Sequence, residues 1–187
     1  MIAKDLVSGE FIPGERFKLS NFIPVGLRDS IERIPYGNYL ICVGYDKDNQ
    51  IGVSGHPHEG ESIEDGFRRE ILEELSLEIK FPTLKFGRRG KFSFLTISLR
   101  NMILVPHLDN EKLGVDRDDR VIICVHGSFD EVYQYLEKVS LSLNNVDKIT
   151  KIWAMKREEA LLKIEEMTEG GKKLFPEAGS EFFIQVP

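Results

Sequence analysis

Five residues with a distinctive spacing fall within fourteen positions in the first half of the chain: Glu61, Arg69, Glu70, Glu73 and Glu74. Carboxylates three and four residues apart lie on the same side of a helix, where like charges repel one another. A divalent cation relieves such repulsion, and Mg2+ and Mn2+ prefer carboxylate oxygens and bind substrate phosphates. The spacing therefore favours a metal site that acts on phosphate, with a solvated acidic helix face as the alternative.

The residues around these carboxylates predict the helix that would position them. Ser62 is a good N-cap, and Asp65 follows three residues later, where a capping box usually has Glu or Gln. An apolar stripe recurs every fourth residue: Ile63, Phe67, Ile71 and Leu75. A strand predicted over residues 50–54 leads into this helix through a loop that begins at Gly55.

The stretch from Gly55 to Leu77 resembles the Nudix box, Gly-x5-Glu-x7-Arg-Glu-U-x-Glu-Glu-x-Gly-U, in which U is aliphatic. The matching residues are Gly55, Glu61, Arg69, Glu70, Ile71, Glu73, Glu74 and Leu77. One position departs, because Ser76 stands where the box has a glycine. A glycine that ends a helix often has a left-handed backbone, which would cost serine about 1 kcal/mol.

The resemblance implies a role for each matching residue. Mg2+ or Mn2+ would be bound by the side chains of Glu70, Glu73 and Glu74 and by the backbone carbonyl of Ser54. Arg69 would orient one glutamate, and Glu61 would support the site from the loop. The implied enzyme is a pyrophosphohydrolase that cleaves a nucleoside diphosphate linked to another group. Its general base would be a box glutamate or a later acid, with candidates at Asp116, Asp118, Asp119, Asp130 and Glu131.

The resemblance also implies a fold. It predicts an α+β protein, a Nudix-type α/β/α sandwich with a mixed central β-sheet. The prediction is a single domain over residues 1–187, with a core at about 36–168 and an extension at each end.

Two other functions remain compatible with the same box. One is a catalytically silent ligand-binding or sensor protein, although such proteins often lose a box carboxylate and this chain keeps them all. The other is an isomerase acting on isopentenyl diphosphate, which needs a reactive cysteine. Cys42 and Cys124 lie in apolar runs and are predicted to be buried, reduced thiols.

Basic and histidine side chains near the box have two interpretations each. Arg88 and Arg89, in the basic turn 87–91, could bind substrate phosphate or could form a solvated hairpin tip. His56 and His58 could touch phosphate or metal, or could be exposed loop residues.

The composition of the chain limits the kinds of partner that we expect it to bind. The chain has 187 residues, 41% hydrophobic residues and a net charge of −6, which predicts a globular protein without general affinity for DNA or membranes. We expect a small nucleotide-type substrate, and capped RNA and a homodimer stay compatible. The N-terminus lacks a signal pattern and no apolar run is long enough to cross a membrane, so we expect a cytoplasmic protein.

The remaining elements follow from hydrophobic periodicity. Strands are predicted at 39–44, 92–105, 121–125 and 149–155, and an extended segment at 77–86. Helices are predicted at 129–139, capped by Ser128, and at 157–167. We expect a strand or hairpin within 1–35, where Phe11, Phe17 and Phe22 cover a domain edge or stack on a base, and a docked tail at Phe182–Ile184.

Overall fold

Side chains of the central strands alternate between two hydrophobic cores. In β2 (Tyr39–Tyr45), Ile41 and Val43 join one core, whereas Leu40 and Cys42 join the other. Because successive side chains of a strand point to opposite faces, each face of the sheet needs a covering layer. The computed structural model describes residues 22–24, 26–45, 48–105, 114–140, 151–169, 173–177 and 181–185.

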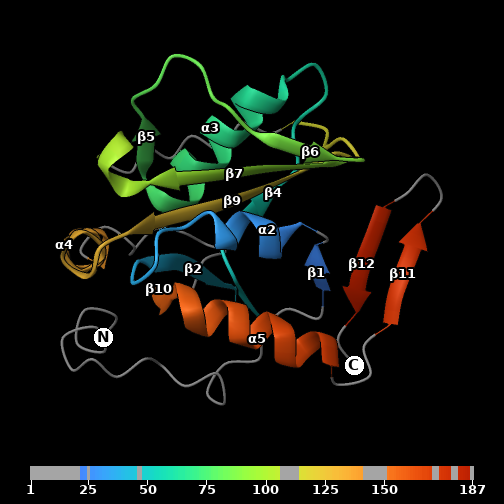
Figure 1. Ribbon diagram of the computed structural model, residues 1–187. Coiled ribbons are helices and arrows are strands. Elements are labelled where there is room, and N and C mark those ends of the chain that lie inside the picture. Colours follow the sequence, from blue (N-terminus) through green and yellow to red (C-terminus); the bar gives the residue numbers. More distant parts are fainter. Residues whose placement is uncertain are drawn as a thin grey trace.

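Two pairs of helices supply those layers. α3 (Ile63–Leu75) and α4 (Phe129–Ser140) pack into the first core, and α2 (Leu27–Glu32) and α5 (Arg157–Glu169) pack into the second. Figure 1 shows α3 on one side of the sheet and α2 and α5 on the other. The molecule is therefore an α/β/α sandwich of the α+β class, as the sequence predicts.

The central sheet mixes parallel and antiparallel strands. Its order is β10 (Lys151–Lys156), β2, β9 (Arg120–Gly127), β7 (Phe92–Ser98) and β6 (Gly87–Arg89). Two short strands join it: β3 (Asp48–Gln50) pairs with β2, and β4 (Val53–Gly55) pairs with β9. Only β7 and β9 are parallel among the pairs described in this sheet.

Two smaller sheets complete the described structure. β5 (Leu77–Ile79) pairs with β8 (Met102–Leu104), so the chain after α3 runs beside the chain after β7. β12 (Glu181–Gln185) lies between β1 (Phe22–Pro24) and β11 (Lys173–Glu177). The predicted docking of the C-terminal tail is therefore confirmed as strand pairing. In the described part of the chain, no helix is both long and apolar enough to cross a bilayer.

Most predicted elements are confirmed. The strands at 39–44 and 121–125 and the two later helices lie within β2, β9, α4 and α5, and the hairpin at 87–91 turns at Gly90. The strand at 149–155 is confirmed from residue 151 onward as β10. Phe11, Phe17 and the residues just before β10 lie outside the described residues.

Several boundaries are wrong. The strand predicted at 92–105 is two strands, because the 3-10 turn η2 (Leu99–Asn101) interrupts it, with the Ser98 hydroxyl accepting the Arg100 N–H at 3.3 Å. The strand predicted at 50–54 splits into β3 and β4 around Gly52, whose φ is +80°. Only β5 is a strand in the segment 77–86, and α2 was not predicted because its six residues are too short to show periodicity.

Candidate active site

Local sequence fixes the start and the orientation of α3. The Ser62 hydroxyl accepts the Asp65 N–H at 3.0 Å and donates to the Asp65 carboxylate at 2.8 Å, which confirms the predicted cap. The apolar stripe faces the first core, where Phe67, Ile71 and Leu75 are fully buried. The rotation of the helix is thereby set, and it turns Glu70 toward the end of β4.

Gly55 makes room for the Glu70 carboxylate. A Cβ atom at position 55 would lie 2.0 Å from the Glu70 carboxyl carbon and 2.2 and 2.4 Å from its two oxygens. The carboxylate therefore packs directly against the backbone where β4 enters the loop. Any side chain at this position would displace it.

Burial changes the acidity of Glu70. The residue is 8% exposed, and this burial raises its pKa to about 7, although the nearby Arg69 guanidinium acts in the opposite direction. Without a further cation, the side chain therefore carries a proton about half of the time near neutral pH. A divalent ion would favour the charged form.

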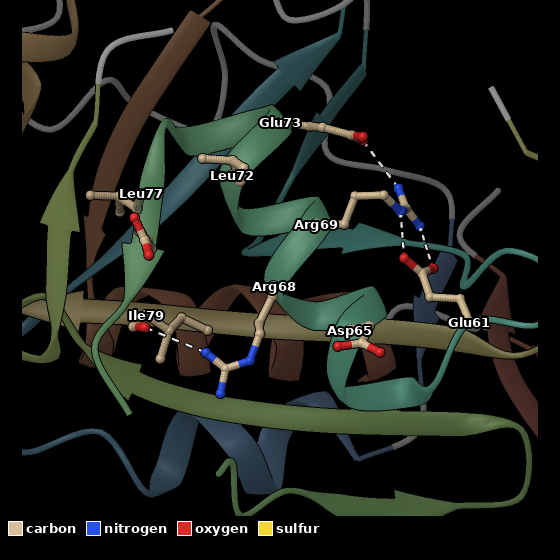
Figure 2. A pocket seen from close by; sticks show the side chains of 9 residues that line it. Glu61, Asp65, Arg68, Arg69, Leu72, Glu73, Leu77 and Ile79 are labelled. Carbon is tan, nitrogen blue, oxygen red and sulfur yellow. Dashed lines mark hydrogen bonds and ion pairs between the residues drawn. The ribbon is translucent and has the colours of Figure 1, made fainter. Parts of the chain in front are cut away.

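The Arg69 guanidinium lies at the centre of the acidic cluster. Its Nε and Nη2 donate to the two oxygens of Glu61 at 2.9 and 3.1 Å. Its Nη1 donates to Glu70 at 2.9 Å and to Glu73 at 3.1 Å, and Nη2 also donates to the His56 carbonyl at 2.7 Å. Figure 2 shows Arg69 extending between Glu73 and Glu61. One cation thus holds three of the four box carboxylates.

These contacts shift two further pKa values. Burial would raise the pKa of Glu61, but the hydrogen bonds from Arg69 and from the His58 N–H hold it below its usual range. Burial would lower the pKa of Arg69, but Glu61 and Glu70 raise it above its usual range. Both groups therefore stay charged at neutral pH, which suits a fixed ion pair.

Residues 114–120 lie against the box loop through backbone contacts. The Glu59 N–H donates to the Val115 carbonyl at 2.8 Å, and the Arg117 N–H donates to the Pro57 carbonyl at 2.9 Å. The Arg117 side chain also donates from Nη1 to the Glu61 carbonyl at 2.6 Å. A segment some sixty residues later in the chain is therefore part of the site.

The two loop histidines contact residues 114–120 through their rings. Nδ1 of His56 lies 2.9 Å from the Asp119 carbonyl, and Nε2 of His58 lies 3.5 Å from the Asp116 carboxylate. A Cβ at Gly114 would be 2.3 Å from the His58 ring, so the backbone approaches the ring closely. Both histidines are half-buried, so the interpretation as exposed loop residues is wrong.

The candidate acids outside the box differ in their surroundings. Asp119 is 15% exposed in its side chain, and its carboxylate accepts from Arg88 at 2.9 Å and from Arg117 Nε at 3.0 Å. Asp116, Asp118 and Asp130 are exposed, and Glu131 pairs with Arg100 and accepts the Ser128 N–H at the start of α4. Asp119 is therefore the least exposed acid of this set, and its segment lies beside the box loop.

Arg88 and Arg89, the arginines predicted to bind phosphate, differ in their exposure and contacts. Arg88 is half-exposed and donates to Asp119 and to the Gly90 carbonyl at 3.0 Å. Arg89 is exposed at the end of β6. Arg117 was not predicted as a site residue, because its neighbours in sequence give no signal of its contact with the box loop.

The backbone conformation predicted for the box position of Ser76 is confirmed. Ser76 has φ 54° and ψ 37°, the left-handed conformation expected where the box has glycine, and its N–H donates to the Leu72 carbonyl at 3.1 Å. Ser54 precedes Gly55 in β4, where it pairs with Ile122 of β9. Oε2 of Glu74 is buried.

The donor types fit a hard divalent cation, because the box supplies the carboxylates of Glu70, Glu73 and Glu74. The positions of the side chains fit a cation less well than the donor types do. Within the described ranges, no group of three or more His, Cys, Asp or Glu side chains is placed to hold an ion. A cation would have to compete with Arg69 for Glu70 and Glu73.

A cavity of about 610 Å³ adjoins the Arg69 side chain. It is lined by Glu61, Asp65, Arg68, Arg69, Leu72, Glu73, Leu77, Glu78 and Ile79 (Figure 2). Its volume is in the range of small-molecule sites, which is about 300–1,000 Å³. The cavity thus gives a ligand access to Glu73 and Arg69.

Comparisons of the chain with protein-family models, with curated proteins and with solved structures found no match.

Proposed function

We propose that the chain is a divalent-metal-dependent hydrolase that cleaves the pyrophosphate bond of a nucleoside diphosphate linked to another group. The observation that carries the proposal is the contact between Gly55 and Glu70, because a buried carboxylate pressed against a strand end has a high cost unless it serves a site. The resemblance to the Nudix box gives that carboxylate its role.

The proposed ligands are the carboxylates of Glu70, Glu73 and Glu74 and the Ser54 carbonyl. Bound Mg2+ or Mn2+ would offset the negative charge that develops at phosphorus and make the attacking water more acidic. Arg69 orients Glu70 and Glu73, and Glu61 holds Arg69 through two hydrogen bonds. A box glutamate then takes the proton of the water.

The proposal assigns Asp119 a supporting role. Its carboxylate is engaged by Arg88 and Arg117, and Arg117 reaches the box loop at the Glu61 carbonyl. Asp119 therefore positions the loop, and the general base is sought among the box glutamates.

Hydrolysis is tested with a panel of dinucleotides, sugar nucleotides, nucleoside triphosphates and capped RNA, each with Mg2+ or Mn2+. The expected result is metal-dependent release of a phosphorylated product that Glu74→Gln abolishes. Glu166→Gln is the matched control, because Glu166 lies on α5 at the other face of the sheet. The proposal fails if the folded wild-type chain cleaves no member of the panel.

A second candidate is a ligand-binding protein without turnover. The position of Arg69 among Glu61, Glu70 and Glu73 favours it, since this guanidinium already offsets part of the negative charge of the cluster. Calorimetry that finds tight nucleotide binding without product would support this function over hydrolysis.

The isomerase has less support. It requires a thiolate at the site, but Cys42 and Cys124 are buried in the second core, and burial raises the pKa of each to about 12.

A further inference from the structure

A second cavity, of about 460 Å³, opens beside the outer edge of β7. β6 pairs with β7 only from Phe92 to Phe94, so in the described structure the edge from Leu95 to Ser98 has no strand beside it. Phe81 and residues 83–85 also line this cavity, which shares no lining residue with the cavity beside Arg69. Its volume suits a small molecule.

The lining combines an apolar surface with an aromatic side chain. Leu84, Leu95 and Ile97 are buried and contribute side chains of the first core. Phe81 is 46% exposed, which leaves part of its ring open to a ligand. Such a surface favours a flat ring that can pack against aliphatic and aromatic groups.

His126 gives the cavity a buried hydrogen-bond donor. The residue is 8% exposed, and its Nδ1 lies 3.1 Å from the Asn38 side-chain nitrogen, which donates to it. Burial lowers the pKa of His126, with Glu131 acting in the opposite direction, so the neutral ring carries its proton on Nε2. His126 Nε2 is not one of the buried side-chain atoms that lack a hydrogen-bond partner in the described part of the chain. Because His126 lines the cavity, we infer that its Nε2–H is accessible there, where a ligand acceptor would replace water.

The charge of this lining is opposite to that of the first cavity. Lys85 is its charged residue, and the described lining contains no Asp or Glu. The cavity beside Arg69 is lined by two arginines, Arg68 and Arg69, and by a larger number of acids: Glu61, Asp65, Glu73 and Glu78. In a chain with a net charge of −6, a local site of this kind favours an anionic ligand.

We propose that this cavity is a second binding site, for a small molecule that joins a flat ring to a phosphate or carboxylate group. The ring packs against Leu95 and Ile97, and the His126 Nε2–H donates to an acceptor of the ligand. The anionic group lies at Lys85. This site is independent of the proposed hydrolysis.

The probes are AMP, adenosine and ribose 5-phosphate. AMP carries both a flat ring and a phosphate, adenosine carries only the ring, and ribose 5-phosphate carries only the phosphate. Calorimetry on the full chain with EDTA present is expected to give a Kd for AMP of about 1 mM or lower. Adenosine and ribose 5-phosphate should each bind about tenfold more weakly than AMP, or weaker still. Lys85→Glu should lower the affinity for AMP by about tenfold or more. Lys80→Glu, an exposed control outside the cavity, should leave AMP binding unchanged.

Glu74→Gln separates the two sites. If it leaves AMP binding intact while Lys85→Glu removes it, the second site stands whether or not the chain is a hydrolase. Three results overturn the proposal: no AMP binding to the wild-type chain, equal binding by Lys85→Glu, or binding that is lost in Glu74→Gln.

Discussion

Arg69 and Glu61 form a two-point ion pair, in which Nε and Nη2 of the arginine donate to the two oxygens of the glutamate. The side chains are only 10% and 16% exposed. Because lysine cannot reproduce the planar fork of the guanidinium, replacing Arg69 by lysine is not a conservative change at this half-buried pair.

Lysine keeps the positive charge but loses the paired hydrogen bonds to Glu61, so we expect Arg69→Lys to lower the free energy of unfolding by about 2 kcal/mol. Arg68→Lys is the matched control, since Arg68 pairs with Glu64 on the same helix in a more exposed position and should cost less than about 1 kcal/mol. Urea denaturation of the two variants checks the difference. Equal losses would show that the Arg69 pair has no special role.

Gly55→Ala is expected to destabilise the chain by about 1–3 kcal/mol and to move the Glu70 carboxylate, because the new Cβ would overlap it. Gly87→Ala provides the control, since a Cβ at that position meets nothing within 4 Å. Thermal unfolding measures the stability of both variants. If Gly55→Ala is as stable as Gly87→Ala, the close packing of Glu70 on the strand end is wrong.

Ser76→Gly should raise the free energy of unfolding by about 1 kcal/mol, because glycine accepts the left-handed conformation that serine holds at a cost. Ser76→Ala keeps a side chain at the same φ and should give no such gain. Chemical denaturation compares the two. A gain of equal size in both variants would assign the effect to the lost hydroxyl instead of the backbone.

Stability should fall with rising pH because of Glu70. Its folded pKa of about 7 is above its ordinary value of 4.5, so between these pH values the folded state binds more protons than the unfolded state. The stabilisation is complete below pH 4.5 and is lost as the pH rises through 7, by about 3 kcal/mol in total.

Unfolding measured from pH 4 to 8 in EDTA tests this for the wild type and Glu70→Gln. The difference between the two free energies isolates Glu70 from other titrating groups. This difference, wild type minus Glu70→Gln, should fall as the pH rises from 4 to 8. A difference that does not vary with pH would mean that Glu70 stays ionised in the folded chain.

The sequence predicts the parts of the site that depend on neighbouring residues. The Ser62 cap, the buried stripe of α3 and the left-handed Ser76 all follow from positions within one helix. Contacts between distant segments could not be predicted. Arg117 meets the Pro57 and Glu61 carbonyls only because β9 begins beside the end of β4.

The errors in the strands have one local and one distant cause. Ser98 turns its hydroxyl to the Arg100 N–H, and this local bond ends β7 in the middle of an apolar run. Gly52 approaches the Ile123 carbonyl so closely that a Cβ would lie 2.8 Å from it. Neither effect changes the hydrophobic pattern from which the strands were predicted.

Binding of Mn2+ tests most directly whether the acidic cluster exists to hold a metal. Electron paramagnetic resonance can count bound Mn2+ in the wild type, in Glu74→Gln and in the control Glu166→Gln. The account predicts saturable binding to the wild type and the control, and loss of that binding in Glu74→Gln. Equal binding by all three proteins, or none by the wild type, would contradict it.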